Sequence, residues 1–405
     1  MPNYRAKYRV LLTILDRSSG DVINTSFLYL GVLGMIIGVP KEIKIHEYRI
    51  GMTPAGVREL IQQGHQVLVQ RDGGAAIGLT NALYEAAGAT LIDTPEEIFA
   101  TADMIVKVKE PQPQECAMLR PEQLLFTYLH LAPDPNQTKL LIESGAVAVA
   151  YETVTDSHGG LPLLAPMSEV AGRMAIQAGA HTLEKAQGGN GTLLGGVPGV
   201  EPGKVVVIGG GVVGENAARM AMGLGADVTV LDRSIDRLKT LDNLYGPRLK
   251  TLYSTVETVE ASVCSADLVV GAVLVPGAAA PKLVKRETLA KMKPGAVLVD
   301  VAIDQGGCFE TSKATTHQDP IYNVDGIVHY CVANMPGGVA RTATFALTNS
   351  TLPYVVALAN KGYNAALLDD AHLRNGLNIY KGKVTCEPVA RDLGYDYVPA
   401  ENVLN

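Results

Sequence analysis

The amino-acid sequence predicts an α/β fold made of two doubly wound domains, with a cleft between them and with one domain split in sequence around the other. Three observations lead to this prediction. Short runs of Val, Ile, Leu and Ala alternate with amphipathic segments. Hydrophobic residues make up 47% of the chain, and 42 residues are Gly while none is Trp. Parallel strands are buried on both faces and read as aliphatic runs, and Gly serves the connections between them.

Length, charge and cysteine content exclude several classes of protein. A chain of 405 residues is long enough to bury a sizeable core without metal or disulfide bonds. It carries 34 Lys and Arg residues against 41 Asp and Glu, a net charge of −7, so nucleic acid is not an expected partner. The five Cys residues form no Cys-x-x-Cys pair, which indicates neither a metal site nor a disulfide framework. We therefore predict a reducing, cytoplasmic location.

Residues 1–34 differ in pattern from the rest of the chain. Met35 is a second plausible start, and it opens a well-formed predicted strand. Asp16 and Asp21 interrupt the preceding stretch, and the apolar run from Phe27 to Val39 is shorter than the roughly 20 residues that a membrane helix needs. We interpret residues 1–34 as a leader or an over-called start outside the fold, and we expect no membrane partner.

The elements of the first domain follow in order from Met35. Aliphatic runs predict strands at 36–39, 66–70, 104–107, 124–129 and 146–150. Helical segments are predicted at 54–63 and 81–87, and Thr53 is a suitable N-cap and Gly64 a suitable stop for the first of them. This alternation is typical of a single α/β layer.

A second domain follows a long helix and a linker rich in Gly and Pro. The helix is predicted at 167–185, with Ser168 at its start, and the linker at 188–203. Strands are then predicted at 204–208, 227–231, 268–271, 296–301 and 328–332, with helices at 215–223, 235–244 and 286–292. An apolar helix at 346–360 and a tail of small helices come last. Because this tail is too short to be a domain, we expect it to complete the first one.

The clearest motif is Gly209-Gly210-Gly211-Val212-Val213-Gly214, which lies directly after a Val-Val-Val-Ile run and opens a helix. Gly209 permits a tight turn, Gly211 lets a pyrophosphate approach the backbone, and Gly214 lets the helix pack on the strand. Asp232 ends the next strand, where a carboxylate binds a ribose diol and repels a 2′-phosphate. The motif predicts NAD as the cofactor, although the neighbouring Arg233 would tolerate a phosphate. A glycine turn without a ligand is the alternative.

Isolated polar residues follow several predicted strands, where α/β folds place their sites. They are Arg49, Lys109, His130, Asp304 and Asn334. Each has a structural alternative: the arginine could pair with Glu42 or Glu47 at the surface, the lysine could end a strand, and the histidine could lie in the core. The aspartate and asparagine could stabilise their own turns. Taken together, two cations, a proton carrier and a carboxylate favour oxidation of an amino or hydroxy acid.

Longer motifs surround these residues. They are Met-Ile-Ile-Gly-Val-Pro-Lys-Glu-Ile-Lys from Met35, Val-Lys-Glu-Pro from Val108, Thr-Tyr-Leu-His-Leu-Ala from Thr127, Leu-Leu-Ala-Pro-Met-Ser-Glu-Val-Ala-Gly from Leu163, Gly-Gly-Val-Pro-Gly-Val-Glu-Pro from Gly195, Val-Asp-Val-Ala-Ile-Asp-Gln-Gly-Gly-Cys from Val299 and Cys-Val-Ala-Asn-Met-Pro-Gly from Cys331. In these motifs the chain resembles the alanine dehydrogenase family, which is related to the nucleotide-binding part of proton-pumping transhydrogenase.

The resemblance implies reversible, NAD-dependent oxidative deamination of L-alanine to pyruvate and ammonium. It assigns His130 as the general acid/base and Asp304 as a second catalytic residue, with Arg49 and Lys109 binding the substrate. It assigns further cofactor contacts to Ser168, Asp232, Arg237, Ser254 and Asn334, beside Gly209, Gly211 and Gly214 of the glycine motif. It further implies Rossmann-like domains, with a substrate domain at 35–162 plus 341–405 around an NAD domain at 163–340, and assembly into a homohexamer.

Two rival functions are compatible with the same glycine motif. A transhydrogenase-like hydride-transfer subunit would need NAD but no amino-acid pocket, and the substrate-side residues Arg49, Lys109 and His130 argue against it. A non-catalytic NAD-binding protein would need neither His130 nor Asp304. The sequence therefore favours an amino-acid dehydrogenase over both.

Overall fold

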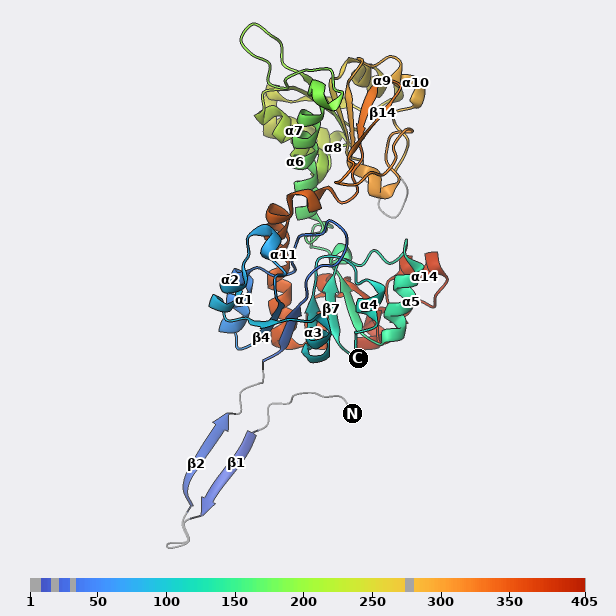
Figure 1. The fold of residues 1–405 in the computed structure, drawn as a ribbon. Coiled ribbons are helices and arrows are strands. Elements are labelled where there is room, and N and C mark those ends of the chain that lie inside the picture. The colour runs from blue at the N-terminus through green and yellow to red at the C-terminus, as the bar shows by residue number, and fades with distance from the viewer. Residues whose placement is uncertain (1–8, 16–21, 30–33, 274–279, 405) are drawn as a thin grey trace. The chain divides into compact units, whose positions relative to one another are not determined.

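The computed structural model describes residues 9–15, 22–29, 34–273 and 280–404. The chain divides into two compact units (Figure 1). Unit 1 comprises Met1–Glu42, Ile50–Thr153 and Thr351–Asn405, and unit 2 comprises Ile43–Arg49 and Val154–Ser350. Unit 1 is therefore split in sequence around unit 2.

The junctions between the units differ from the predicted domain boundaries. They lie at 153/154 and 350/351 instead of 162/163 and 340/341, and Ile43–Arg49 group with unit 2. Helix α11 (Ala340–Lys361) runs without a break through the second junction, so no turn residue marks it. The Arg49 guanidinium contacts Met167 and Asn334 of unit 2.

The sheet of unit 2 has the strand order β11-β10-β9-β12-β13-β15-β14. All neighbouring strands are parallel except the pair β14 and β15. The chain enters at β9, proceeds outward through β10 and β11, and then returns to build the other half from β12. The strands are β9 (Lys204–Ile208), β10 (Asp227–Asp232), β11 (Lys250–Tyr253), β12 (Leu268–Gly271), β13 (Val297–Asp300), β14 (Ile321–Val324) and β15 (Ile327–Tyr330).

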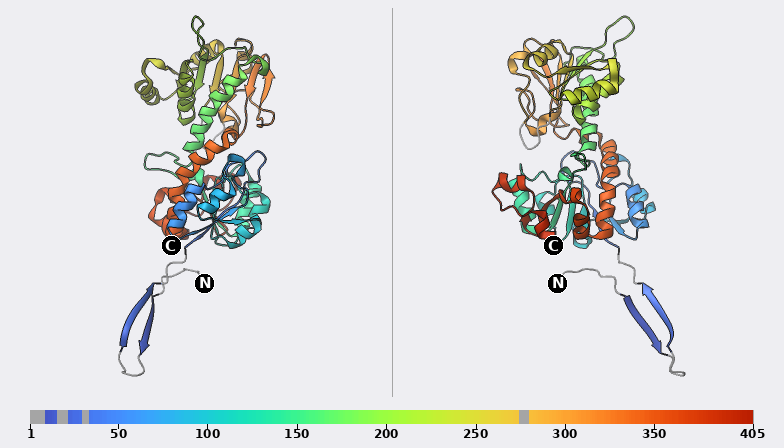
Figure 2. Two further views of the ribbon diagram at one scale, coloured as in Figure 1. Left: turned by 60° about the vertical axis from the view of Figure 1, so that its left-hand side comes forward. Right: turned by 180° about the vertical axis from the view of Figure 1, so that it is seen from behind.

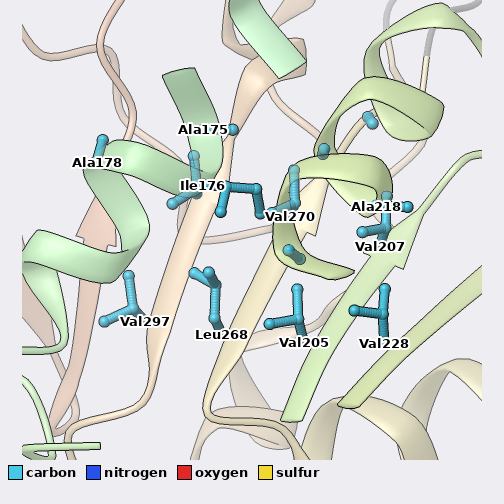
Figure 3. Packing of buried hydrophobic residues seen from close by; sticks show 14 of the residues in the cluster. Ala175, Ile176, Ala178, Val205, Val207, Ala218, Val228, Leu268, Val270 and Val297 are labelled. Carbon is cyan, nitrogen blue, oxygen red and sulfur yellow. The ribbon is translucent and has the colours of Figure 1, made fainter. Parts of the chain in front are cut away.

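Alternate residues of β9 face opposite sides of this sheet, as the pleat of a strand requires. Val205 and Val207 pack on one side in a cluster with Ala175 and other helical residues (Figure 3). Val206 packs on the other side with Val263. Both faces are therefore apolar, which explains why the strand reads as an unbroken aliphatic run.

Helices cover both faces of the unit 2 sheet. Residues of α6, α7 and α8 belong to the first cluster, and residues of α9 and α10 belong to the second. The helices are α6 (Ala165–Thr182), α7 (Val212–Gly223), α8 (Ile235–Tyr245), α9 (Val256–Ser265) and α10 (Arg286–Leu289), and the short 3₁₀ turns are η3 (Lys185–Gln187), η4 (Gly246–Arg248), η5 (Val301–Gln305) and η6 (Met335–Val339). This arrangement, with the sheet order above, is the predicted doubly wound fold.

The sheet of unit 1 has the order β17-β16-β8-β7-β6-β3-β4-β5. Strands β3 to β8 are parallel and repeat the order seen in unit 2, while β16 and β17 join antiparallel. The C-terminal segment thus completes this sheet. The strands are β3 (Ile36–Val39), β4 (Gln66–Gln70), β5 (Thr90–Ile92), β6 (Met104–Val106), β7 (Leu124–Thr127), β8 (Val147–Ala150), β16 (Leu377–Tyr380) and β17 (Lys383–Val384).

The helices of unit 1 flank its sheet, as the two views of Figure 2 show. Thr53 caps the first helix through a hydrogen bond from the Gly56 N–H, as predicted. The helices are α1 (Pro54–Gln62), α2 (Asn81–Ala86), α3 (Pro95–Thr101), α4 (Pro113–Cys116), α5 (Pro135–Ser144), α12 (Tyr363–Asp369), α13 (Ala371–Arg374), α14 (Glu387–Leu393) and α15 (Ala400–Leu404), and the 3₁₀ turns are η1 (Ala75–Ile77) and η2 (Tyr151–Thr153).

The predicted leader contains two of the described strands. β1 (Arg9–Leu15) and β2 (Val22–Tyr29) pair antiparallel and form a two-stranded sheet of their own. Residues 1–8, 16–21 and 30–33 of the predicted leader lie outside the described residues. Within the described ranges, no helix has both the length and the apolar character that crossing a bilayer requires.

Candidate functional site

The glycine turn of unit 2 has the geometry that its sequence predicts. Gly209 has φ of 101°, and a Cβ there would lie 2.6 Å from the carbonyl oxygen of Ala272. A Cβ on Gly214 would overlap the carbonyl oxygen of Gly209, so only glycine lets α7 approach the turn this closely. At Gly211, by contrast, a Cβ would meet no atom of the described residues within 4 Å. The backbone of Gly211, the N-cap of α7, is therefore open to a ligand.

Asp232 lies beside this turn, at the end of β10. One carboxylate oxygen accepts the Gly210 N–H at 2.6 Å, and the other accepts the Ser234 N–H at 2.7 Å. The amide of Ser254, at the end of β11, donates to the Asp232 carbonyl oxygen at 3.0 Å. Asp232 and Ser254 thus meet at the carboxyl edge of the sheet, next to the glycine turn.

Arg237, predicted to contact the cofactor, lies against the same turn. Its Nε donates to the Gly210 carbonyl oxygen at 2.5 Å, and its Nη2 forms an ion pair with Glu215. Tyr245 donates to the other oxygen of that carboxylate at 3.0 Å. These contacts tie α7, α8 and the glycine turn together, a structural role that the sequence did not indicate.

Arg49 is held in a buried cluster of unit 2. Its Nε and Nη2 donate to the two carboxylate oxygens of Glu47 at 2.7 and 2.6 Å. Nη2 also donates to the Asn334 side-chain oxygen at 2.9 Å, and Nη1 contacts the Met167 sulfur at 3.2 Å. The side chains of Arg49 and Glu47 are 2% and 1% exposed. The predicted ion pair of Arg49 therefore exists with Glu47, but it is buried and does not lie at the surface.

The charge of Arg49 controls the ionisation of its partner. Burial raises the pKa of Glu47, but the hydrogen bonds and the positive charge of Arg49 outweigh it, with help from Asn334, and the pKa lies below its ordinary value. Asn334 adopts a left-handed backbone conformation with φ of 60°, and its side-chain amide donates to Glu47 at 3.2 Å. A predicted substrate contact and a predicted cofactor contact are thus bonded to each other.

Asp304 lies in η5, the turn that follows β13, and it is exposed. A second carboxylate, Asp300, fixes this loop from inside the protein. It is fully buried and accepts hydrogen bonds from the amides of Ala302 at 3.1 Å and Cys308 at 2.9 Å, and from the Ser312 hydroxyl. Burial raises the pKa of Asp300, and these hydrogen bonds oppose the rise.

The position of Ser168 differs slightly from the prediction. Helix α6 begins at Ala165 with Leu164 at the N-cap, so Ser168 lies within the first turn and does not start the helix. The Pro at position 166 favours this earlier start because its missing N–H is not needed in a first turn.

Lys109 and His130 belong to unit 1 and follow the neighbouring parallel strands β6 and β7. The Thr127 hydroxyl donates to the Lys109 carbonyl oxygen at 2.9 Å, which links the two segments. The His130 side chain is 46% exposed, so this residue is not a core histidine. Its ring stacks on Tyr128, with centroids 5.8 Å apart and an interplanar angle of 5°.

Glu152 is a partner of His130 that the sequence reasoning missed. The carboxylate accepts the backbone N–H of His130 at 2.6 Å and lies 3.8 Å from its Nδ1. Glu152 follows β8, the next strand in the sheet. The rule that selected Lys109 and His130, a polar residue just after an aliphatic strand, also applies to Glu152.

The two units therefore each gather part of the predicted set at the carboxyl ends of their strands. Unit 1 contributes Lys109 and His130. Unit 2 joins Arg49 to Asn334, and it places Asp232, Arg237 and Ser254 around the glycine turn. In the part of the chain that the structure describes, His, Cys, Asp and Glu side chains form no group of three that could hold a metal ion.

Comparisons with known proteins agree with this arrangement. The family models described as "Alanine dehydrogenase/PNT", N-terminal and C-terminal domains, match residues 38–171 and 175–387. An alanine dehydrogenase of Halomonas elongata is 63% identical over 370 residues, which cover 91% of this chain and 100% of that relative. The alanine dehydrogenase of Bacillus subtilis is 56% identical over 371 residues, 91% of this chain and 98% of the relative.

Solved structures extend the similarity to three dimensions. An L-alanine dehydrogenase structure superposes with a TM-score of 0.86 at 50% identity and covers 89% of this chain and 99% of its own. A transhydrogenase structure from Sinorhizobium meliloti, at 24% identity and a TM-score of 0.75, shares the fold. On these grounds, the chain belongs to the alanine dehydrogenase/PNT family.

Proposed function

We propose that this protein is an NAD-dependent alanine dehydrogenase, which converts L-alanine, NAD and water reversibly to pyruvate, ammonium, NADH and a proton. The observation that carries the proposal is the open backbone at Gly211 beside Asp232, in a chain that matches alanine dehydrogenases at 50–63% identity over most of its length. Polar residues of the right types follow the strands of both sheets.

NAD fits the glycine turn of unit 2. A pyrophosphate placed over Gly211 would meet backbone N–H groups and the positive end of the twelve-residue helix α7. The Asp232 carboxylate is in place for a ribose diol, and each of its oxygens can accept a further hydrogen bond beyond those from Gly210 and Ser234. We assign Ser168, Arg237, Ser254 and Asn334 to the rest of the cofactor site. Bound NAD supplies the acceptor for the hydride of the alanine Cα–H bond.

Arg49 and Lys109 provide the positive charge that an amino or oxo acid requires. A guanidinium forms charge-assisted hydrogen bonds with a carboxylate, and Glu47 fixes the plane of the Arg49 guanidinium. Because Nε and Nη2 already donate to Glu47 and Asn334, the substrate carboxylate would bind Nη1 or displace one of these partners. We assign the substrate carboxylate to Arg49 and the oxygen that becomes the carbonyl of pyruvate to Lys109. The ammonium group of Lys109 stabilises the negative charge that develops on that oxygen.

His130 and Asp304 provide the proton chemistry. In the direction of alanine oxidation, His130 takes a proton from the water-derived hydroxyl group as ammonia leaves, and in the reverse direction it returns that proton. Because Nδ1 lies toward Glu152, we assign the proton transfer to Nε2. Asp304 is assigned to orient the water or ammonia molecule. Assembly as a homohexamer and a cytoplasmic location are part of the same proposal.

The test is a spectrophotometric assay of the full chain. NADH oxidation is measured with ammonium and, in turn, pyruvate, glyoxylate and 2-oxobutyrate. We expect the fastest rate with pyruvate, and formation of NADH from L-alanine at alkaline pH. In His130→Ala we expect turnover to fall roughly 10²- to 10⁴-fold while NADH fluorescence titration shows unchanged binding. Unchanged turnover in this variant would refute the role of His130.

The same assay separates the rival functions. A transhydrogenase-like subunit would transfer hydride between nicotinamide nucleotides without any 2-oxo acid. A non-catalytic protein would bind NADH and oxidise none. Light scattering of the purified chain measures the oligomeric state, and any state other than a hexamer would contradict that part of the proposal.

A further inference from the structure

A completely buried lysine lies two residues before the predicted substrate contact Lys109. The side chain of Lys107 is 0% exposed, and its ammonium group bridges two carboxylates, Glu42 at 3.1 Å and Glu115 at 2.6 Å. These carboxylates are 1% and 3% exposed. Burial lowers the pKa of Lys107, but the charges and hydrogen bonds of Glu42 and Glu115 outweigh this effect and raise it. The lysine is therefore charged at neutral pH.

Each carboxylate uses its second oxygen for a different stretch of backbone. The second oxygen of Glu42 accepts the amide N–H groups of Val108 at 2.6 Å and of Lys109 at 3.2 Å. The second oxygen of Glu115 accepts the N–H of Gln112 at 2.8 Å, at the start of α4. Of these two carboxylates, Glu42 is the one whose hydrogen bonds reach the backbone of Lys109.

Two other side chains donate hydrogen bonds to carbonyl oxygens of the same segment. The Tyr151 hydroxyl donates to the Lys107 carbonyl oxygen at 3.0 Å, and the Thr127 hydroxyl donates to the Lys109 carbonyl oxygen at 2.9 Å. Both Tyr151 and Thr127 are buried. Residues 107–109 lie just beyond the end of β6. Lys107 still donates its N–H to the Phe126 carbonyl oxygen at 3.2 Å, and the Val108 carbonyl oxygen accepts the Tyr128 N–H at 3.3 Å, so fixed side chains supply the hydrogen bonds that these backbone partners do not.

The cluster lies at the carboxyl ends of two parallel strands, where α/β folds bind their ligands. Glu42 follows β3 and Lys107 follows β6, and these strands are neighbours although β4 and β5 come between them in the sequence. The strand order reverses at this point, and the carboxyl ends on either side of such a reversal form a crevice. Glu42 and Lys107 therefore follow the two strands on either side of this reversal.

Hydrophobic packing alone does not explain why the charged side chains of Lys107, Glu42 and Glu115 are buried here. Removing ionic groups from water is costly, and apolar residues of similar volume fill a core at equal or lower free energy. The charges do provide directed hydrogen bonds, which an apolar core cannot give to the amides of Val108 and Lys109.

We propose that Glu42 is a positioning residue, which holds the backbone of Lys109 in place so that its side chain meets the substrate oxygen. Glu42 does not touch the substrate, and Lys107 acts only as its buried counter-ion. This inference rests on the proposed function for its catalytic consequence, whereas the backbone contact itself is a property of the fold.

The experiment compares Glu42→Gln with Glu115→Gln in the full chain. Both substitutions keep the size of the side chain and remove one negative charge from the same lysine. A carboxamide has a single acceptor oxygen. In Glu42→Gln the NH₂ group therefore faces either the Lys107 ammonium group or the amides of Val108 and Lys109, all of which are donors. We expect Glu42→Gln to lower kcat/KM for pyruvate roughly 10- to 100-fold, the loss that a small displacement of a reacting group produces. Glu115→Gln should stay within about twofold, by the same reasoning.

Four further measurements distinguish positioning from stability. Thermal unfolding should show similar losses for both variants, and the affinity for NADH should be unchanged. Glu42→Asp, which keeps both oxygens, should recover part of the lost kcat/KM. Site-resolved hydrogen exchange should show the amides of Val108 and Lys109 exchanging at least about tenfold faster in Glu42→Gln only, because one hydrogen bond corresponds to about that factor.

The outcomes separate the two proposals. Equal losses of kcat/KM in the two Gln variants, or unchanged exchange at Val108 and Lys109 in Glu42→Gln, would overturn the positioning role. If the wild-type chain shows no activity with pyruvate and the exchange rates differ as expected, the proposed function fails while the backbone contact of Glu42 stands.

Discussion

Glu152 and His130 are joined by a hydrogen bond from the His130 backbone N–H to the Glu152 carboxylate, at 2.6 Å. His130 has φ of 49°, a left-handed conformation that costs a non-glycine residue roughly 1–2 kcal/mol. The carboxylate offsets this cost, and it also accepts the Leu129 N–H at 3.2 Å. The imidazole is thereby placed on Tyr128 with Nδ1 toward Glu152.

Glu152→Ala should lower kcat without changing the affinity for NADH. Loss of the acceptor leaves the amides of Leu129 and His130 without their partner, and the backbone of His130 can relax from its left-handed conformation. We expect kcat to fall roughly 10- to 100-fold and the free energy of unfolding to fall by about 1–3 kcal/mol. Steady-state kinetics and denaturant unfolding measure the two effects. A loss of stability with unchanged kcat would show that Glu152 serves the fold alone.

Two alanine substitutions in the glycine turn should behave in opposite ways. In Gly211→Ala the new methyl group meets no atom of the described residues within 4 Å, so thermal stability should be kept while the methyl group occupies the space assigned to the pyrophosphate. NADH titration should show affinity weakened by at least about tenfold, or 1.4 kcal/mol. In Gly214→Ala the methyl group overlaps the Gly209 carbonyl, so stability should fall by roughly 1–3 kcal/mol. Unaltered NADH affinity in Gly211→Ala would contradict the assigned cofactor site.

Asp232→Gly should relax the preference for NAD over NADP. The substitution removes the negative charge that repels a 2′-phosphate and leaves Arg233 nearby. It also removes the acceptor for the Gly210 N–H, so affinity for both cofactors should decrease. Asp232→Asn serves as the control, because its side-chain oxygen can still accept that hydrogen bond. The ratio of kcat/KM values for NAD and NADP is the measurement, and an unchanged ratio in both variants would exclude Asp232 as the discriminating residue.

Glu47 should make the stability of unit 2 depend on pH in the acid range. The pKa of Glu47 in the folded protein is below its ordinary value of 4.5. The stability that its charge contributes is therefore fully present above about pH 4.5 and is lost as the pH falls through the lower, folded-state pKa. Glu47→Gln should flatten this part of the pH dependence of unfolding. It should also lower stability at neutral pH by roughly 3–5 kcal/mol, because Arg49 is left buried without its counter-ion. A parallel pH dependence in wild type and variant would contradict this role.

Most of the parallel strands could be predicted because burial on both faces gives them unbroken aliphatic runs. The run before Gly209 is the clearest case, and its predicted bounds at 204–208 are those of β9. The strands that were missed lack this pattern. β5, β11 and β14 lie at sheet edges, and β11 reads Lys-Thr-Leu-Tyr, with one side chain half-buried and three exposed. β16 is buried, but it reads Leu-Asn-Ile-Tyr, with its polar Asn378 hydrogen-bonded to Thr153 at 2.8 Å.

Buried charges were harder to predict than strands. Lys107 ends an aliphatic run and was included in the predicted strand at 104–107, with no sign that its side chain lies between two carboxylates. Glu42 was weighed only as a surface partner of Arg49. Their pairing depends on the adjacency of β3 and β6, strands that are far apart in the sequence.

The sequence by itself determined the fold class, the glycine turn and the list of polar residues at strand ends, because each of these depends on local pattern. Only the tertiary structure decided which of these residues are bonded to each other: Arg49 to Glu47 and Asn334, Glu152 to His130, and Glu42 to the backbone of Lys109. The physical reason is that a local sequence fixes periodicity and turn conformation, whereas the partner of a buried charge is set by strands that become neighbours only when the sheet is assembled.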